Sequence, residues 1–237
     1  MIALPELDAF TTRFAQCHYE PLRVIFNLLP NSRVVNYDPI HLDGLLARAV
    51  VTQATQGKMV SDQKDGYWIP LPLKMLWRDE KGFPLWASSV LYPASPSIED
   101  VYIRHKRNPP GNTHNKKKLV TKSGPWMPRR IPTPTLVCDR YEARCIGNFD
   151  AVKNLLNTFD LIGKLRLGRI KSITVEQADF TEQDVFLADG KLIKPIPAEA
   201  NLVSWWQSQS SMLIGWTPPH WKPGLFRLGF QANTKIK

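Results

Sequence analysis

The chain has 237 residues, of which 43% are apolar and 22% charged, a composition that indicates a globular protein and excludes intrinsic disorder. No apolar run reaches the roughly 18 residues of a membrane span, and the acidic start MIALPELDAF is unlike a signal peptide. The formal net charge of +10 makes a polyanion the expected partner.

The first part of the chain predicts a strand, a helix and a pair of strands. Residues 19–29 (YEPLRVIFNLL) are rich in branched and aromatic side chains, which is typical of a buried strand. Apolar residues at steps of three and four predict an amphipathic helix over residues 41–53. Residues 68–77 and 85–92 are expected to form two strands joined by a turn around Lys81 and Gly82. Two prolines favour an edge position for the first of these strands.

The hydrophobic pattern stops between residues 95 and 134, where Pro, Gly, Asn and Lys dominate. We expect a long loop or thumb-like insertion here, weakly ordered without a partner. Nine of the chain's 31 basic residues lie between Arg104 and Arg130, and that stretch has no acidic residue. The other 22 basic residues are nearly balanced by 21 acidic ones. The excess positive charge is therefore local.

Regular patterns return after the insertion. Residues 141–146 predict a short strand, and either Asn148 or Asp150 can cap a second helix with its apolar stripe at Val152, Leu155, Leu156 and Phe159. A glycine-rich loop over residues 162–169 leads into an alternating strand at 170–176. Beyond it we expect a packed tail with one or two short strands.

In chain order these elements follow a β-α-β-β-α-β pattern, apart from the insertion and one extra strand. The pattern predicts an α+β protein with a ferredoxin-like, RRM-type core. We expect residues 1–94 to form the first part of this core and residues 95–134 the basic insertion. Residues 135–237 are expected to form the second part, with the glycine-rich loop and an extension rich in proline and tryptophan.

The glycine-rich loop (IGKLRLGR) has the composition of a phosphate-binding turn. Glycines allow sharp turns and the close approach of a ligand, and basic side chains donate to phosphates. The loop follows a helix and lacks the Gly-Lys-Ser/Thr ending of a nucleotide P-loop. A helix C-cap followed by a solvated basic turn explains the same residues equally well. The candidate RNA-binding residues are Gly163, Lys164, Arg166, Gly168, Arg169 and Lys171.

The insertion is the second candidate nucleic-acid contact. Its basic side chains can follow a phosphate backbone while an aromatic side chain stacks on unpaired bases. The alternative is a lysine loop that only solvates the fold. Its candidate residues are Arg104, Lys106, Arg107, Lys116, Lys117, Lys118, Lys122, Trp126, Arg129 and Arg130.

Motifs of metal-dependent or triad hydrolases are absent from the sequence: there is no HExxH, DxD or GxSxG. We therefore expect no catalytic metal, no cofactor and no enzymatic activity. Metal-independent RNA cleavage needs only a placed general acid or base, for which His41, His105 and His114 are the candidates. Cys17, Cys138 and Cys145 fit no zinc or redox spacing, which favours free thiols in a reducing cytoplasm.

Several segments together resemble the RAMP superfamily of CRISPR effector subunits. They are the first helix (HLDGLLA), the segments IPLPL and WASSV, and the glycine-rich loop in its place before the last core strand. The segment PPHW at residues 218–221 is similar to type IV members. The match is nearest to the type IV subunit that caps the 5′ handle of the guide RNA.

This resemblance implies a cytoplasmic, non-catalytic RNA-binding subunit of an antiviral ribonucleoprotein. Its implied partners are the guide CRISPR RNA, the backbone RAMP subunits, and target DNA near the flanking motif. Two alternatives stay open. One is the metal-independent endoribonuclease of the same superfamily, which processes CRISPR repeat RNA. The other is a general DNA-binding or ribosome-associated protein whose basic loop is a polyanion arm.

Overall fold

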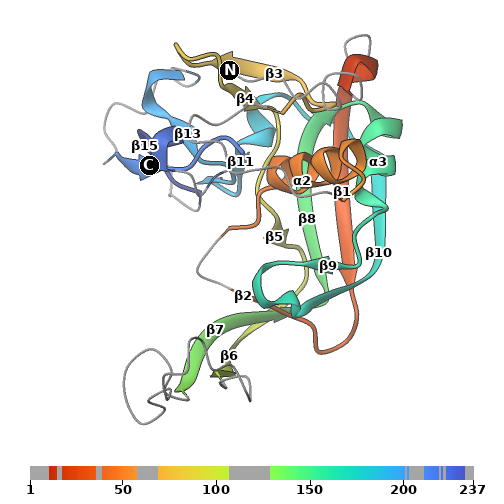
Figure 1. Ribbon diagram of the computed structural model, residues 1–237, viewed down its shortest axis with the longest axis vertical. Coiled ribbons are helices and arrows are strands. Elements are labelled where there is room, and N and C mark those ends of the chain that lie inside the picture. Colours follow the sequence, from red (N-terminus) through yellow and green to blue (C-terminus); the bar gives the residue numbers. More distant parts are fainter. Residues whose placement is uncertain are drawn as a thin grey trace, which may run out of the picture.

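The computed structural model describes residues 11–14, 18–35, 39–57, 69–106, 129–200, 202, 211–218, 220 and 223–232 (Figure 1). The described part is an α+β structure with antiparallel strand pairs and two α-helices, α2 (Leu42–Ala54) and α3 (Phe149–Leu156). Its first ten strands are β1 (Glu20–Leu28), β2 (Arg33–Val35), β3 (Met75–Arg78), β4 (Pro84–Trp86), β5 (Tyr92–Pro93), β6 (Ser97–Lys106), β7 (Arg129–Cys138), β8 (Arg140–Gly147), β9 (Leu161–Ile162) and β10 (Gly168–Gln177). The last five are β11 (Leu187–Ala188), β12 (Lys191–Leu192), β13 (Ile196–Pro197), β14 (Met212–Ile214) and β15 (Arg227–Phe230).

The largest sheet has five strands in the order β5-β8-β1-β10-β9. Its central strand alternates in burial: Leu22, Val24 and Phe26 are buried, whereas Arg23 is exposed. The buried side chains pack with Leu46 of α2 and with α3, so both helices cover one face of the sheet. The two-residue period of the strand and the apolar stripes of the helices together produce this arrangement.

The structure confirms the main elements expected before the insertion. Strand β1 and helix α2 lie within one residue of the predicted bounds, and β3 and β4 pair across the turn at Lys81 and Gly82. The expected strands over 68–77 and 85–92 are shorter than predicted. The first strand is confined to residues 75–78, preceded by an isolated bridge between Leu73 and Gly147, and the second divides into β4 and β5.

The second helix is confirmed, and its cap is Asn148. The Asn148 side chain accepts a hydrogen bond from the Ala151 backbone N–H at 2.9 Å, while Asp150 lies in the first turn. Strand β10 then returns antiparallel beside β1, pairing Val24 with Val175.

We expected a weakly ordered insertion over residues 95–134. This expectation is wrong for both ends of that segment. Strands β6 and β7 pair along ten residues, from Ser97 opposite Cys138 to Lys106 opposite Arg129, and form a three-stranded sheet in the order β2-β7-β6. Pro132 and Pro134 lie opposite Ile103 and Val101 of β6, beyond the residues of β7 that pair with β2, so their missing N–H groups break no ladder with β2. Residues 107–128 lie outside the described part.

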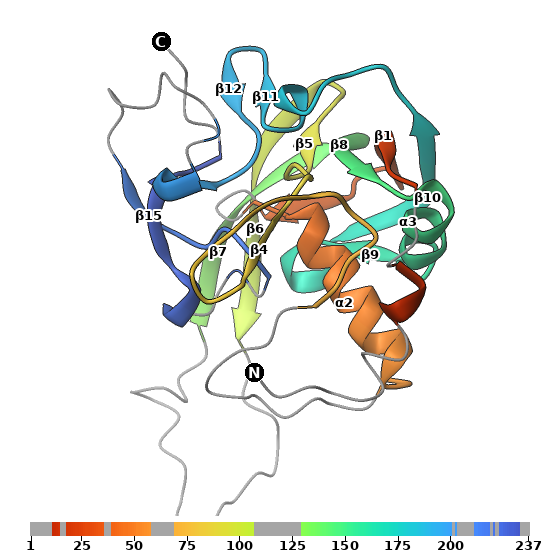
Figure 2. The same ribbon diagram turned by 90° about the horizontal axis from the view of Figure 1, so that it is seen from above.

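The tail after Glu176 has more structure than expected. It contains the hairpin β11–β12 and a sheet in the order β13-β15-β14, with its own buried cluster around Trp216, Phe230 and Ile196. Leu85 of β4 belongs to the same cluster. Figures 1 and 2 show this C-terminal unit beside the main sheet, next to β4. Trp205 and Trp206 lie outside the described residues.

Two further expectations concern the membrane and the cysteines. Neither α-helix of the described part has the length and apolar content that crossing a bilayer requires. Cys138 and Cys145 are buried free thiols, and burial raises the pKa of Cys145 to about 12. Cys17 lies outside the described residues.

Candidate nucleic-acid interface

The glycine-rich loop runs from β9 through a short 3-10 turn (Lys164–Arg166) into β10. Gly163 has φ +75°, and Leu165 follows at φ +63°, so the backbone turns sharply in the left-handed region. A Cβ on Gly168 would lie 2.8 Å from the Ile162 carbonyl oxygen. Both glycines are therefore required by the local backbone rather than serving only as a helix cap.

Strand β2 and the turn that precedes it hold this loop in place. The Arg33 backbone N–H donates to the Leu167 carbonyl at 3.2 Å, and the Leu29 N–H donates to the Arg169 carbonyl at 2.9 Å. The Ser32 hydroxyl donates to the same Arg169 carbonyl at 3.2 Å. The loop consequently has a defined position relative to β2, although its basic side chains at Lys164, Arg169 and Lys171 are exposed.

The same strand carries the β6–β7 hairpin. Strand β2 pairs with β7, and the Arg33 guanidinium forms an ion pair with Asp100 of β6 at 2.9 Å. The loop over residues 161–171 and the β6–β7 hairpin therefore occupy the same end of the molecule, which we call the basic end (Figure 1). The glycine-rich loop and the basic insertion are separate features in the sequence. The three-residue strand β2 brings them together in the structure.

The predicted basic residues are placed as follows. Arg104, Arg129 and Arg130 are exposed on the hairpin, and Lys106 and Arg166 occupy positions in β6 and in the loop. The remaining candidates of the insertion lie outside the described residues, namely Arg107, Lys116, Lys117, Lys118, Lys122 and Trp126.

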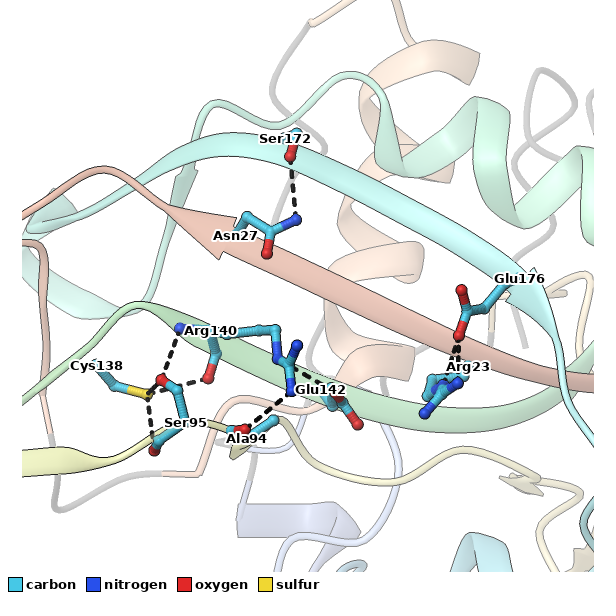
Figure 3. A network of polar contacts seen from close by, with 9 residues as sticks. All are labelled: Arg23, Asn27, Ala94, Ser95, Cys138, Arg140, Glu142, Ser172 and Glu176. Carbon is cyan, nitrogen blue, oxygen red and sulfur yellow. Dashed lines mark hydrogen bonds and ion pairs between the residues drawn. The ribbon is translucent and has the colours of Figure 1, made fainter.

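The sheet face turned away from the helices is polar but largely neutralised (Figure 3). Arg23 forms a hydrogen-bonded ion pair with Glu176 at 2.6 Å, and Arg140 lies 3.4 Å from Glu142. The Asn27 side chain of β1 donates a hydrogen bond to the Ser172 hydroxyl of β10 at 3.1 Å. Because these arginines have carboxylate partners, this face attracts phosphate less than the basic end does.

A second polar constellation is buried between α2 and the C-terminal unit. Lys194, with its side chain 1% exposed, donates to Asp43 Oδ2 at 2.7 Å and to Ser88 Oγ at 3.3 Å. His220 Nε2 lies 2.9 Å from Asp43 Oδ1, and the His220 ring stacks on His41 with centroids 3.6 Å apart. We call these residues the Asp43 cluster.

The Asp43 cluster has a definite charge arrangement. His220 Nδ1 faces the Gly215 carbonyl oxygen at 3.2 Å, and Nε2 faces the Asp43 carboxylate. Burial alone would raise the pKa of Asp43, but Lys194 and His220 outweigh it and hold that pKa far below its ordinary value. Burial and His220 lower the pKa of His41, so His41 is the neutral partner of the stack.

His41, Asp43 and His220 offer three metal-ligand atoms within 4.8 Å of one another. A metal lies close to the plane of each imidazole that binds it, at about 2.0–2.1 Å from the nitrogen. Two rings stacked 3.6 Å apart with planes 16° apart cannot both point at one ion. The arrangement therefore fits an ion-pair network that joins α2 to the C-terminal unit.

Sequence reasoning missed this cluster. The sequence offered His41 only as a candidate general acid or base, and it singled out neither Asp43 nor Lys194. The available signal was a polar pair, His41 and Asp43, at the start of an otherwise apolar helix, together with an isolated His220. No pattern in the sequence connects them, because 151 residues separate Asp43 from Lys194.

Comparison of the chain with protein-family models finds no matching family, and comparison with curated proteins finds no match.

Proposed function

We propose that this chain is a non-catalytic RNA-binding subunit of a type IV CRISPR ribonucleoprotein that holds the 5′ handle of the guide RNA. In this proposal the core is ferredoxin-like and of the RAMP type. The chain works in the cytoplasm, contacts backbone RAMP subunits, and lies near the flanking motif of the target DNA.

The sheet topology supports the ferredoxin-like core. Strand β1, helix α2, strands β5 and β8, helix α3 and strand β10 follow one another in the chain, and the strands lie in the order β5-β8-β1-β10. This is a β-α-β-β-α-β chain with both helices on one face. The glycine-rich loop falls between the second helix and the last strand of that core, where the resemblance expects it.

The observation that carries the RNA-binding proposal is the packing of the glycine-rich loop against β2. Strand β2 also pairs with the basic hairpin, so the two cationic segments lie at the same end of the molecule. A surface of exposed Lys and Arg at a fixed backbone turn suits a phosphate backbone, because the contacts require charge and little rearrangement.

The surroundings of His41 bear on the endoribonuclease alternative. His41 stacks on His220, and its Nδ1 is buried without a hydrogen-bond partner in the described structure. A general base must reach the proton it removes within about 2.6–3.2 Å, and the buried Nδ1 of His41 is not placed to do so for an RNA on the surface. His105 is exposed on β6, and His114 lies outside the described residues. A cleavage assay therefore belongs in the test.

The purified chain is incubated with labelled CRISPR repeat RNA and scored for retained complex and for cleavage without added metal. We expect retention, no cleavage, and a binding constant that falls with salt concentration. Arg169→Gln and Lys171→Gln should each lower the slope of log K against log salt by about 0.7, the value for one single-strand phosphate contact. Lys191→Gln, an exposed lysine of β12, is the matched control and should leave the slope unchanged.

The other outcomes are equally informative. Cleavage would overturn the non-catalytic assignment in favour of the processing endoribonuclease. Equal affinity for repeat RNA and for unrelated duplex DNA would favour the general polyanion-binding protein. Heparin displacing the repeat RNA as readily as it displaces unrelated RNA would contradict specific binding of the handle.

A further inference from the structure

The β6–β7 hairpin is a two-stranded ribbon that extends away from the main sheet (Figure 1). All ten residues of β6 pair with β7, and the partner strand β2 reaches only Thr135, Leu136 and Val137. From Val101 to Lys106, strand β6 therefore pairs only with β7, and the two strands form a two-stranded ribbon.

The register assigns the exposed side chains of this ribbon to its two faces. Directly opposite residues of an antiparallel pair point to the same face, and successive residues alternate between faces. Arg104 lies opposite Ile131 on one face, whereas His105 lies opposite Arg130 on the other. Arg104, His105 and Arg130 are all exposed. Cationic side chains are thus available on both faces of the ribbon.

Charge also changes along the ribbon. Its base carries Glu99 and Asp100, of which Asp100 is paired with Arg33 at 2.9 Å. From Arg104 to Arg130 the sequence has no acidic residue. The positive charge is concentrated at the part of the ribbon farthest from the main sheet.

A narrow ribbon with cationic side chains on both faces can contact two phosphate backbones at once. We propose that the β6–β7 ribbon occupies the major groove of B-form duplex DNA, with Arg104 and Arg130 directed at the phosphates of opposite strands. A flat single-stranded ligand would contact one face and leave the second cation without use.

The dimensions of the ribbon select this groove over others. Paired strands lie about 4.8 Å apart, and a major groove about 12 Å wide admits a two-stranded ribbon, whereas an undeformed minor groove about 6 Å wide does not. The major groove of A-form RNA is too narrow for side chains to read. A duplex of B-form DNA is therefore the ligand that the ribbon fits.

This inference rests on the proposed function only in that both use the basic end as the nucleic-acid contact. In the proposed complex the glycine-rich loop holds guide RNA, and the ribbon holds the duplex that flanks the target.

The test measures binding of the full chain to a fluorescent DNA duplex of about three helical turns over a range of salt concentrations. Arg104→Gln and Arg130→Gln should each lower the slope of log K against log salt by about 0.9, and the double variant by about 1.8. Lys191→Gln should leave it unchanged. A slope that responds to only one of the two arginines would mean contact by a single face and would overturn the proposal.

Groove-specific competitors supply a second readout. Netropsin, which fills the minor groove, should leave binding intact, whereas a duplex with bulky glucosyl groups on its cytosines in the major groove should lose it. Displacement by netropsin, or equal affinity for an RNA duplex of the same sequence, would contradict the proposal. Absence of duplex binding would do so as well.

Retention of repeat RNA, measured on the same preparations, separates the two proposals. Loss of duplex binding with RNA retained overturns the ribbon's role and leaves the RNA-binding function standing. Duplex binding without RNA retention overturns the proposed function and supports the ribbon's role.

Discussion

Asp43 is a buried carboxylate whose two oxygens serve different partners, Lys194 on Oδ2 and His220 on Oδ1. Taking such charges out of water costs several kcal/mol each, which good geometry and further hydrogen bonds offset. Ser88 supplies one of these bonds to Lys194, and the Gly215 carbonyl supplies another to His220. The network joins the first turn of α2 to two distant positions of the C-terminal unit.

Replacing Asp43 by Asn should destabilise the protein strongly, because it leaves Lys194 buried without a counter-charge. We expect a loss of about 3–5 kcal/mol in the free energy of unfolding, measured with urea at pH 7. The exposed Asp179→Asn is the control and should change that free energy little. The double variant Asp43→Asn with Lys194→Met removes both charges and should recover part of the loss. A loss as small for Asp43→Asn as for the control would contradict the role of the cluster.

At the scale of elements, the glycine-rich loop depends on a close approach between backbones. Gly168 begins β10 opposite Ile162 of β9, and the space for a Cβ is taken by the Ile162 carbonyl at 2.8 Å and by Val34 at 3.2 Å. Sequence reasoning identified the glycines but could not choose between a helix cap and a packed turn. The neighbour that decides the question is β2, more than 120 residues earlier in the chain.

Gly168→Ala should shift this loop and weaken both stability and RNA binding. Crowding of this kind typically costs 1–3 kcal/mol, and for a chain of this size each kcal/mol lowers Tm by about 2–4 °C. The comparison is Gly224→Ala, because a Cβ at Gly224 meets nothing within 4 Å. Thermal unfolding and repeat-RNA retention measure the two effects. Equal melting temperatures for the two variants would mean that the loop accommodates the methyl group freely.

The β6–β7 hairpin escaped sequence reasoning for a physical reason. Hydrophobic periodicity reports burial of one face, and the ribbon exposes both of its faces: Ile98, Val101 and Ile103 are all more than 40% exposed. Its prolines also argued against a strand, although an edge without a ladder partner tolerates them. Pairing with β2 and the Arg33–Asp100 ion pair show where the ribbon is anchored.

At the scale of the whole molecule, two hydrophobic clusters make up the described core. One is built from the main sheet with α2 and α3, and the other from the C-terminal strands with β4. The Asp43 cluster lies between α2 and the second group, so its protonation affects how the two units are joined. Its titratable and charged members are His41, Asp43, Lys194 and His220.

We expect stability to fall in two steps as the solution is acidified. The folded protein lowers the pKa of His41 below its ordinary value of 6.5, so the unfolded chain binds more protons and unfolding is favoured as pH falls below about 6.5. Asp43 has a depressed pKa, so its contribution is complete above the ordinary value of 3.8 and is lost below it.

Urea unfolding between pH 7 and pH 3 measures these steps. His41→Phe keeps an aromatic ring against His220 and removes the titrating group, so it should flatten the step that begins near pH 6.5. The step below pH 3.8 should remain in that variant. An unchanged first step would assign it to another group.

The sequence by itself determined the elements whose residues report one-sided burial: β1, α2, α3 and β10, and with them the α+β class. It also located the excess positive charge, because charge is a property of residues and needs no fold. Tertiary structure alone decided the joining of the loop and hairpin through β2, the ordered ribbon, the second hydrophobic cluster and the buried Asp43 network. These features depend on contacts between residues far apart in the chain, and no local pattern encodes such a pairing.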